Sequence, residues 1–196
     1  MPFINNVMTS GPFGPGITSV ERNWAESSLV LSNAYRPRIR NCAFWSSRKG
    51  IEIGLADASG QPTIHASVSV GTAKGIHIYK TGTAPLSAPV RVENAHWNNE
   101  AHGLLLENLD GFEVCGSVPY FQYEEGVSST DYADIEAVGC PTGRVEGCIF
   151  WYNGFDARTP VRIGEGGGGI AVRHNHIARN ITRTPLSLDP ELYATA

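Results

Sequence analysis

The stretch "GGIAVRHNHIARN", residues 168–180, contains the pattern that decides the fold. Its apolar residues alternate with polar ones, skip across Asn175, and then alternate again. Alternation predicts a β-strand, and Asn tolerates the left-handed backbone conformation of a tight bend. We therefore interpret the stretch as a strand, a bend at Asn175 and a second strand.

Related units without the histidines recur upstream. They are Ile39-x-Asn41-x-x-Phe44, Val90-x-Val92-x-Asn94-x-x-Trp97 and Val145-x-Gly147-x-x-Phe150. A second motif, glycine followed by alternating apolar residues, begins at Gly50, Gly75, Gly103 and Gly169. Gly50 and Gly103 each stand nine residues after the bend of their unit, so counting back nine residues from Gly75 adds a bend at Ala66.

The predicted bends at 41, 66, 94, 147 and 175 are separated by steps of 25, 28, 53 and 28 residues. Because 53 is one short step plus one long step, a further coil is expected between Asn94 and Gly147, with Gly126-Val127 as its glycine position. A period of this length with short strands is typical of a solenoid, in which each turn buries its apolar face by stacking on its neighbours. A leucine-rich repeat is excluded because its leucine pattern and its helices are missing.

These Asn bends and glycine strands make the chain resemble the right-handed parallel β-helix superfamily, which includes pectate-lyase-like enzymes and bacteriophage tailspikes. The resemblance implies an all-β fold, a single-stranded right-handed parallel β-helix of about six coils with N- and C-terminal capping segments. We expect an N-terminal arm and cap over residues 1–36, the β-helix over 37–180, and a C-terminal cap or tail over 181–196. A capping box at Thr18-x-x-Glu21 predicts a short helix over residues 19–27 that places Trp24 on the first coil.

Superposing the coils predicts two buried columns. One contains Cys42, Ala95 and Cys148, and the other contains Phe44, Trp97 and Phe150. Trp45 and Trp151 have the opposite parity and should point outward. Cys42 and Cys148 are four coils apart, about 19 Å at the strand spacing, and cannot form a disulfide. A bridge between Cys115 and Cys140 is left open.

Composition excludes several classes of function. A net charge of -4 with dispersed basic residues gives no surface for nucleic acid or an anionic membrane. No apolar run is long enough to span a bilayer, and the N-terminus does not have the pattern of a signal peptide. His174 and His176 flank a bend and would lack a third ligand, so no metal is expected. The glycine run from Gly164 to Gly169 lacks the Lys of a phosphate loop, and no cofactor is expected.

The polar segment "YEEGVSSTDYADIE", residues 123–136, holds the candidate catalytic carboxylates Asp131, Asp134 and Glu136. Two carboxylates at a suitable distance can act as acid and base on a glycosidic bond. A polar loop rich in Asp and Glu is also the ordinary composition of a solvated surface. Aromatic side chains can stack on sugar rings, and the candidate carbohydrate-binding residues are Tyr120, Tyr123, Tyr132, Trp45 and Trp151.

The sequence therefore leads to two functional hypotheses. The first is a bacteriophage tail or tailspike component of the virion, made in the host cytoplasm, that is structural or binds a cell-surface polysaccharide of the host. Such a component is expected to form a homotrimer and to contact other virion tail proteins, because outward tryptophans are usually covered by another chain. The alternative is a small polysaccharide depolymerase, a lyase or glycoside hydrolase. An ice-binding solenoid is disfavoured because regular Thr-x-Thr ladders are missing.

Overall fold

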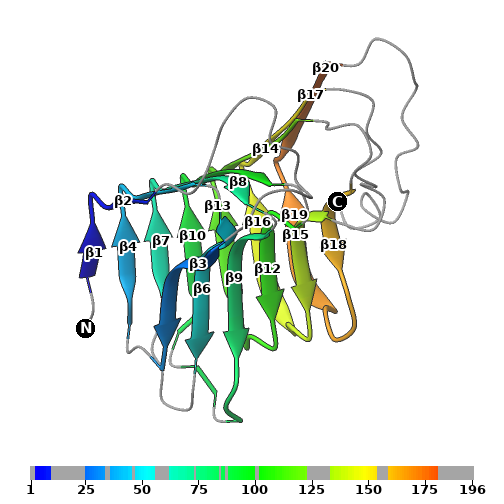
Figure 1. The fold of residues 1–196 in the computed structure, drawn as a ribbon. Coiled ribbons are helices and arrows are strands. Elements are labelled where there is room, and N and C mark those ends of the chain that lie inside the picture. Colours follow the sequence, from blue (N-terminus) through cyan, green and yellow to red (C-terminus); the bar gives the residue numbers. More distant parts are fainter. Residues whose placement is uncertain are drawn as a thin grey trace.

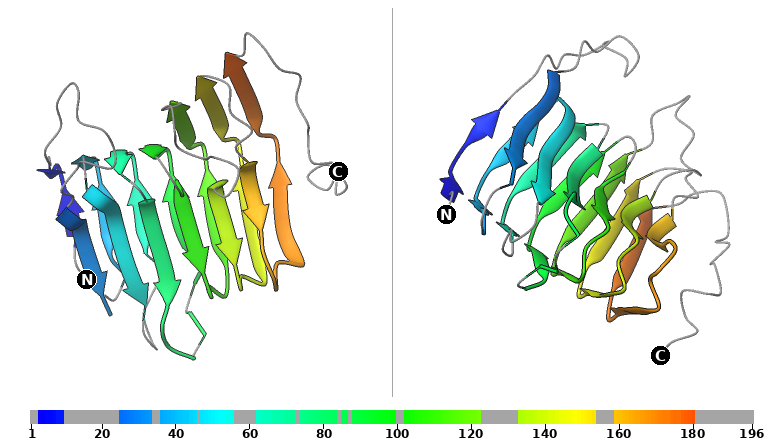
Figure 2. Two further views of the ribbon diagram at one scale, coloured as in Figure 1. Left: turned by 45° about the vertical axis from the view of Figure 1, so that its right-hand side comes forward. Right: turned by 90° about the horizontal axis from the view of Figure 1, so that it is seen from below.

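The computed structural model describes residues 3–9, 25–33, 36–45, 47–55, 62–72, 74–83, 85–86, 88–99, 102–122, 133–153 and 159–180. All regular elements in this part of the chain are β-strands, and all of their pairings are parallel (Figure 1). Successive strands of each sheet lie side by side along one axis, so that the chain winds as a β-solenoid (Figure 2).

Three sheets form the sides of the solenoid. Sheet A contains β1 (Phe3–Asn5), β4 (Arg38–Arg40), β7 (Thr63–His65), β10 (Val90–Glu93), β13 (Phe112–Cys115), β16 (Thr142–Glu146) and β19 (Gly169–Arg173). Sheet B contains β2 (Met8–Thr9), β5 (Ala43–Trp45), β8 (Val68–Thr72), β11 (His96–Asn99), β14 (Val118–Gln122), β17 (Ile149–Asn153) and β20 (His176–Asn180). Sheet C contains β3 (Ala25–Ser32), β6 (Ser47–Leu55), β9 (Lys74–Lys80), β12 (Leu104–Glu107), β15 (Ala133–Val138) and β18 (Thr159–Ile163).

Each coil visits sheet A, then sheet B, then sheet C. The predicted class, an all-β parallel solenoid, is confirmed, although the coil count differs slightly: six turns of three strands are followed by two strands of a seventh. The solenoid also begins earlier than residue 37, because β1 pairs with β4 from Phe3 onward and β3 pairs with β6. Residues 181–196, the predicted C-terminal cap, lie outside the described part of the chain.

The corner between sheets A and B is a single residue with positive φ in every coil. These residues are Asn6, Asn41, Ala66, Asn94, Gly116, Gly147 and His174. The predicted bends at 41, 66, 94 and 147 are confirmed, whereas the last one falls on His174 rather than Asn175. The expected additional coil bends at Gly116, where a Cβ atom would lie 2.6 Å from the Oδ1 atom of Asn94 in the preceding coil.

From the bend at Asn41 to the bend at Gly147, the residue after each bend is buried, and hydrogen bonds between coils run through this column. The amide of Cys42 donates to Ser67 Oγ at 3.3 Å, and the amide of Ala95 donates to Ser117 Oγ at 3.2 Å. The amide of Cys148 donates to Asn175 Oδ1 at 2.8 Å. Asn175 is therefore a core hydrogen-bonding residue, which explains why it is not the bend itself. A buried backbone N–H without a partner would be destabilising, so this column stabilises every second corner.

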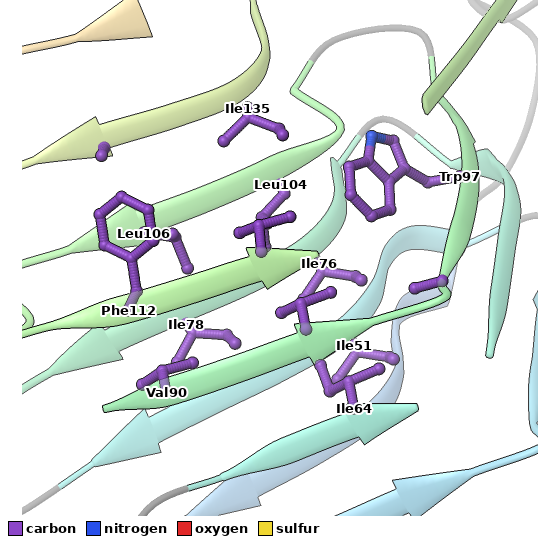
Figure 3. Packing of buried hydrophobic residues seen from close by; sticks show 14 of the residues in the cluster. Ile51, Ile64, Ile76, Ile78, Val90, Trp97, Leu104, Leu106, Phe112 and Ile135 are labelled. Carbon is purple, nitrogen blue, oxygen red and sulfur yellow. The ribbon is translucent and has the colours of Figure 1, made fainter. Parts of the chain in front are cut away.

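The core is built from aligned columns of side chains. Phe44, Trp97 and Phe150 are each at most 1% exposed, which confirms the predicted burial. In the register of sheet B, Ser69 stands between Phe44 and Trp97, and Pro119 follows Trp97. Figure 3 shows Trp97 beside the column that includes Ile51, Ile76, Leu104 and Ile135 of sheet C. Residues of large and small type therefore alternate in this register, an order that close packing favours.

Three local predictions are wrong. The helix expected over residues 19–27 is contradicted from Ala25 onward, because Ala25–Ser32 is strand β3, and its earlier residues lie outside the described part. The glycine position expected at Gly126-Val127 is also wrong, because the sheet C strand of that coil is Ala133–Val138 and places Ile135, not Val127, opposite Leu104. The strand that begins at Gly169 belongs to sheet A. Gly50 and Gly75, in contrast, lie in β6 and β9 of sheet C, and Gly103 directly precedes β12 of the same sheet.

All four cysteines are free thiols. Cys42, Cys140 and Cys148 are buried, and burial raises the pKa of the Cys148 thiol to about 11. Cys115 lies at the half-exposed end of β13, in register with Glu93 and Glu146. The Cys115–Cys140 bridge that the sequence left open is therefore not formed.

Candidate functional site

The outer face of sheet B carries an aromatic pair, of which one ring is exposed and the other half-buried. Trp151 in β17 is 47% exposed, and Tyr120 in β14 is aligned with it on the neighbouring strand. Because strand residues with the same parity share a face, two rings in register on adjacent strands lie one above the other along the solenoid. Two of the five predicted carbohydrate-binding residues are thus brought together.

A histidine and an exposed isoleucine lie beside this pair. The rings of His96 and Tyr120 have centroids 6.2 Å apart, and Ile149 beside Trp151 is 41% exposed. Burial lowers the pKa of His96, against a hydrogen bond involving the backbone of Val118 that raises it. The imidazole of His96 is therefore uncharged at neutral pH.

The outer face of sheet C is different, because it concentrates acids and histidines. Glu52, His77, Leu105, Glu136 and Arg162 occupy one row of adjacent register positions. Tyr79 and Glu107 lie in the next row. The surface therefore brings groups of opposite charge and several proton-transfer groups together on one side of the molecule.

Two hydrogen-bonded units lie at one end of this face. His77 Nε2 is bonded to Glu107 Oε2, and the Tyr79 hydroxyl donates to Glu52 Oε1 at 3.3 Å. Burial acts to raise the pKa of Glu52, but bonds from Lys49, Ser27 and Tyr79 outweigh it and lower that pKa. Burial raises the pKa of Tyr79, and the negative charge of Glu52 adds to this effect.

A third unit surrounds the predicted residue Glu136. Its Oε2 atom lies 2.8 Å from His102 Nδ1, and its Oε1 atom lies 3.7 Å from a guanidinium nitrogen of Arg162. The Glu136 side chain is 13% exposed, so the carboxylate is sheltered but open to solvent at one side. Neighbouring Asp134 is 1% exposed, and a polysaccharide at the surface does not reach it.

The other predicted site residues are placed only in part. Asp131, Tyr123 and Tyr132 lie outside the described residues. Trp45 ends β5 in register with Val70, and its side chain is outside the described part as well. Among the predicted site residues whose side chains are described, Tyr120 and Trp151 lie on sheet B and Glu136 lies on sheet C.

Sheet A carries a ladder of ion pairs. Glu113 contacts Arg91 at 2.8 Å and Arg144 at 3.5 Å, and Glu146 contacts Arg173 at 3.4 Å. His174 also binds Glu146 at 3.3 Å, and this bond is the largest of the effects that lower the pKa of that carboxyl. Among the described residues no group of three or more His, Cys, Asp or Glu is arranged to hold a metal ion.

Sequence reasoning missed Glu52, His77 and Glu107 as site residues. The signal was present in the glycine strands, where Glu52 and His77 occupy the same position between the two apolar residues. Because the apolar residues point inward, the residue between them must point outward. Stacking the repeats would have placed these two side chains in one outer row.

No helix in the described part of the chain has the length and apolar character to cross a bilayer. Comparison of the chain with models of protein families, with curated proteins and with solved structures finds no match.

Proposed function

We propose that this protein is a glycan-binding structural component of a bacteriophage tail or tailspike, built as a right-handed β-helix of the pectate-lyase-like and tailspike-like superfamily. The proposed role is located in the virion, next to other tail proteins, and the proposed ligand is a host cell-surface polysaccharide. The observation that carries the proposal is the aligned pair of Tyr120 and Trp151 on the outer face of sheet B.

A large indole half exposed on a flat sheet leaves apolar surface in water, which a ligand with an apolar face can cover. The C–H faces of pyranose rings are such a ligand, and rigid aromatic residues lose little conformational freedom on binding. A parallel solenoid supplies the rigid support that holds both rings in place.

We predict that Trp151→Ala and Tyr120→Ala each weaken glycan binding. If each ring is an anchor of the interface, the loss is at least about 2 kcal/mol, roughly a 30-fold rise in Kd. Isothermal titration calorimetry with host surface polysaccharide measures this directly. Arg38→Ala, which removes an exposed side chain on sheet A, is the matched control and should leave the Kd unchanged. Equal losses in all three variants would contradict the assignment to sheet B.

A second candidate function, polysaccharide cleavage, is favoured by the carboxylates of sheet C. Glu136 is aligned with Leu105, and Glu107 stands two residues further along the same strand as Leu105. Strand geometry therefore separates the two glutamates by about 8 Å at their Cα atoms. Inverting glycosidases hold their two carboxyl groups about 6.5–9.5 Å apart. Two glutamates on one face with Cα atoms at this separation can reach such a carboxyl distance through their side-chain rotamers, which is the reason to consider acid–base hydrolysis.

For this second function, Glu136→Gln and Glu107→Gln are expected to lower the cleavage rate by a factor of at least about 100, since an amide cannot replace a general acid or base. Incubation with surface polysaccharides and detection of reducing ends measures the rate. Glu146→Gln on sheet A is the matched control and should cleave as the unchanged protein does. Cleavage that survives both sheet C substitutions would remove these residues from consideration.

We further propose that the protein forms a homotrimer through its first coil. Four of the seven exposed large hydrophobic residues in the described part belong to this coil, and they are Phe3, Val7, Met8 and Val30. Apolar groups on all sides of one coil are covered when equivalent coils of several chains meet. Light scattering should give a trimer mass, and Met8→Ser should shift the mass toward the 21.1 kDa of one chain. A mass near that of one chain for the unchanged protein at micromolar concentration would contradict the trimer.

A further inference from the structure

We propose that the open edge of β18 is the binding site for residues 184–188 of this same chain, which add to sheet C as its seventh strand. The added strand is parallel to β18 and closes the last coil of the solenoid. This inference is independent of the proposed glycan binding. It is carried by the described end of the solenoid and by a repeat in the sequence.

The last coil is incomplete in the described part of the chain. Sheets A and B each contain seven strands and sheet C contains six, so β19 and β20 have no sheet C strand in their own coil. The amide of Gly164 donates to the carbonyl of Ala137 on the β15 side at 2.8 Å. Because backbone groups alternate in direction along a strand, the amides of Val161 and Ile163 face the other side, where β18 has no described neighbour. An open row of this kind readily pairs with a further strand.

Apolar side chains are also uncovered at this end. Ile163 is 37% exposed, whereas the four residues before it in the same inward column are at most 2% exposed, and they are Ile53, Ile78, Leu106 and Ala137. Ile170, Val172 and Ile177 of the last coil are only partly buried against the core. Each coil of a solenoid is covered by the next one, so these residues indicate that further chain belongs on this end.

The sequence that follows β20 repeats the sequence of β18. Residues 158–163 read "RTPVRI" and residues 183–188 read "RTPLSL", with Arg-Thr-Pro in both copies followed by two apolar residues on either side of a polar one. The two copies are 25 residues apart, which is also the step between the bends at Asn41 and Ala66. The repeat therefore aligns Leu186 with Val161 and Leu188 with Ile163, and it places Ser187 outward beside Arg162.

The connection from β20 has a suitable length. Five residues, 181–185, separate Asn180 from Leu186. The equivalent connections have four residues between Asn99 and Leu104, 100–103, and seven between Asn153 and Val161, 154–160. A proline is tolerated in an edge strand, and Pro160 already stands in β18 at the position that Pro185 repeats. Pro190, two residues after Leu188, lacks the amide that a longer strand would need.

A disulfide tests both the pairing and its register. Arg162→Cys is combined with Ser187→Cys in a full-length Cys115→Ser background, which removes the half-exposed native thiol. Opposed Cα atoms of neighbouring strands are about 4.8 Å apart, within disulfide reach, so mild oxidation should link the two residues within one chain. Asp189→Cys with Arg162→Cys is the register control. Its Cα separation is about 8 Å, beyond the usual limit of about 7 Å, and we expect at least about tenfold slower linkage.

Hydrogen exchange supplies a second measurement on the protein without engineered thiols. Replacing Leu186 and Leu188 together by Ser should speed exchange of the Val161 and Ile163 amides at least about tenfold, because the added strand supplies their acceptors. Leu192→Ser is the matched control, since it makes the same change outside the proposed strand, and it should leave both amides unaffected.

The outcomes distinguish the occupants of this edge. A disulfide that joins two chains, seen as a doubled mass under denaturing, non-reducing conditions, would show that a second copy supplies the strand and would overturn binding within one chain. Equal linkage at residues 187 and 189 would overturn the register. Failure of both pairs to link, or unchanged amide exchange in the double leucine variant, would overturn the inference. None of these results alters the test of glycan binding by Trp151→Ala.

Discussion

Trp97→Ala is expected to lower the free energy of unfolding by about 3–5 kcal/mol, the usual cost of replacing a fully buried Trp by Ala. Trp97 is 0% exposed and lies in the middle coil of the stack, with Ser69 and Pro119 as its neighbours in the column. Those two residues are small, and the backbones of parallel strands cannot approach one another to fill the space. The cavity therefore remains, and urea denaturation followed by circular dichroism measures its cost.

Two companion variants make this result specific. Trp97→Phe keeps an aromatic ring in the column and should cost clearly less than Trp97→Ala. Trp151→Ala removes a tryptophan of the same sheet that is 47% exposed, and surface substitutions change stability by about 0.5 kcal/mol or less. Similar losses for Trp97→Ala and Trp151→Ala would mean that the inward and outward faces of sheet B are reversed.

Gly103→Ala is the second substitution with a large expected effect. A Cβ atom at this position would lie 2.2 Å from Trp97 Nε1 and 2.5 Å from the backbone oxygen of Asp134. The backbone oxygen cannot move without disturbing the pairing of β15, so the expected loss is about 1–3 kcal/mol or more. Gly168→Ala is the matched control, because a Cβ atom there would meet nothing within 4 Å. Equal stability of the two variants would refute the close approach at Gly103.

The two sites are expected to be coupled. In a Trp97→Phe background the indole nitrogen is gone, so Gly103→Ala should cost less than in the unchanged protein. Part of the cost should remain because the Asp134 oxygen is still present. A double-mutant cycle in urea gives this interaction energy. Strict additivity would mean that the indole does not rest against Gly103.

The inward columns could be predicted from the sequence because burial repeats with every coil. The bends at Asn41, Asn94 and Gly147 and the burial of Trp97 follow from apolar spacing alone. The last bend was misplaced by one residue because Asn is a good bend residue, but here the side chain of Asn175 serves the core hydrogen bond to Cys148 instead. A residue type that suits two roles does not distinguish them.

Contacts between coils were harder to predict, because the coils differ in length. The bend at Gly116 follows Asn94 by 22 residues and precedes Gly147 by 31, so a fixed period could not locate it. The pairs His77–Glu107 and His102–Glu136 join residues 30 and 34 positions apart. Such pairs depend on where each insertion falls, and only the three-dimensional register fixes that.

The alternating column at the corner of sheets A and B restricts how many coils the chain can gain or lose. Asn94 stands 53 residues after Asn41 and 53 residues before Gly147, and each of these coils has a large ring and an amide that donates to the next coil. The coils between them supply the acceptor and a small residue in the ring column. Loss of a single coil would bring two large rings together and leave an amide without its acceptor, whereas loss of two would preserve both patterns. Gain or loss of coils in pairs is therefore the change in length that this column tolerates.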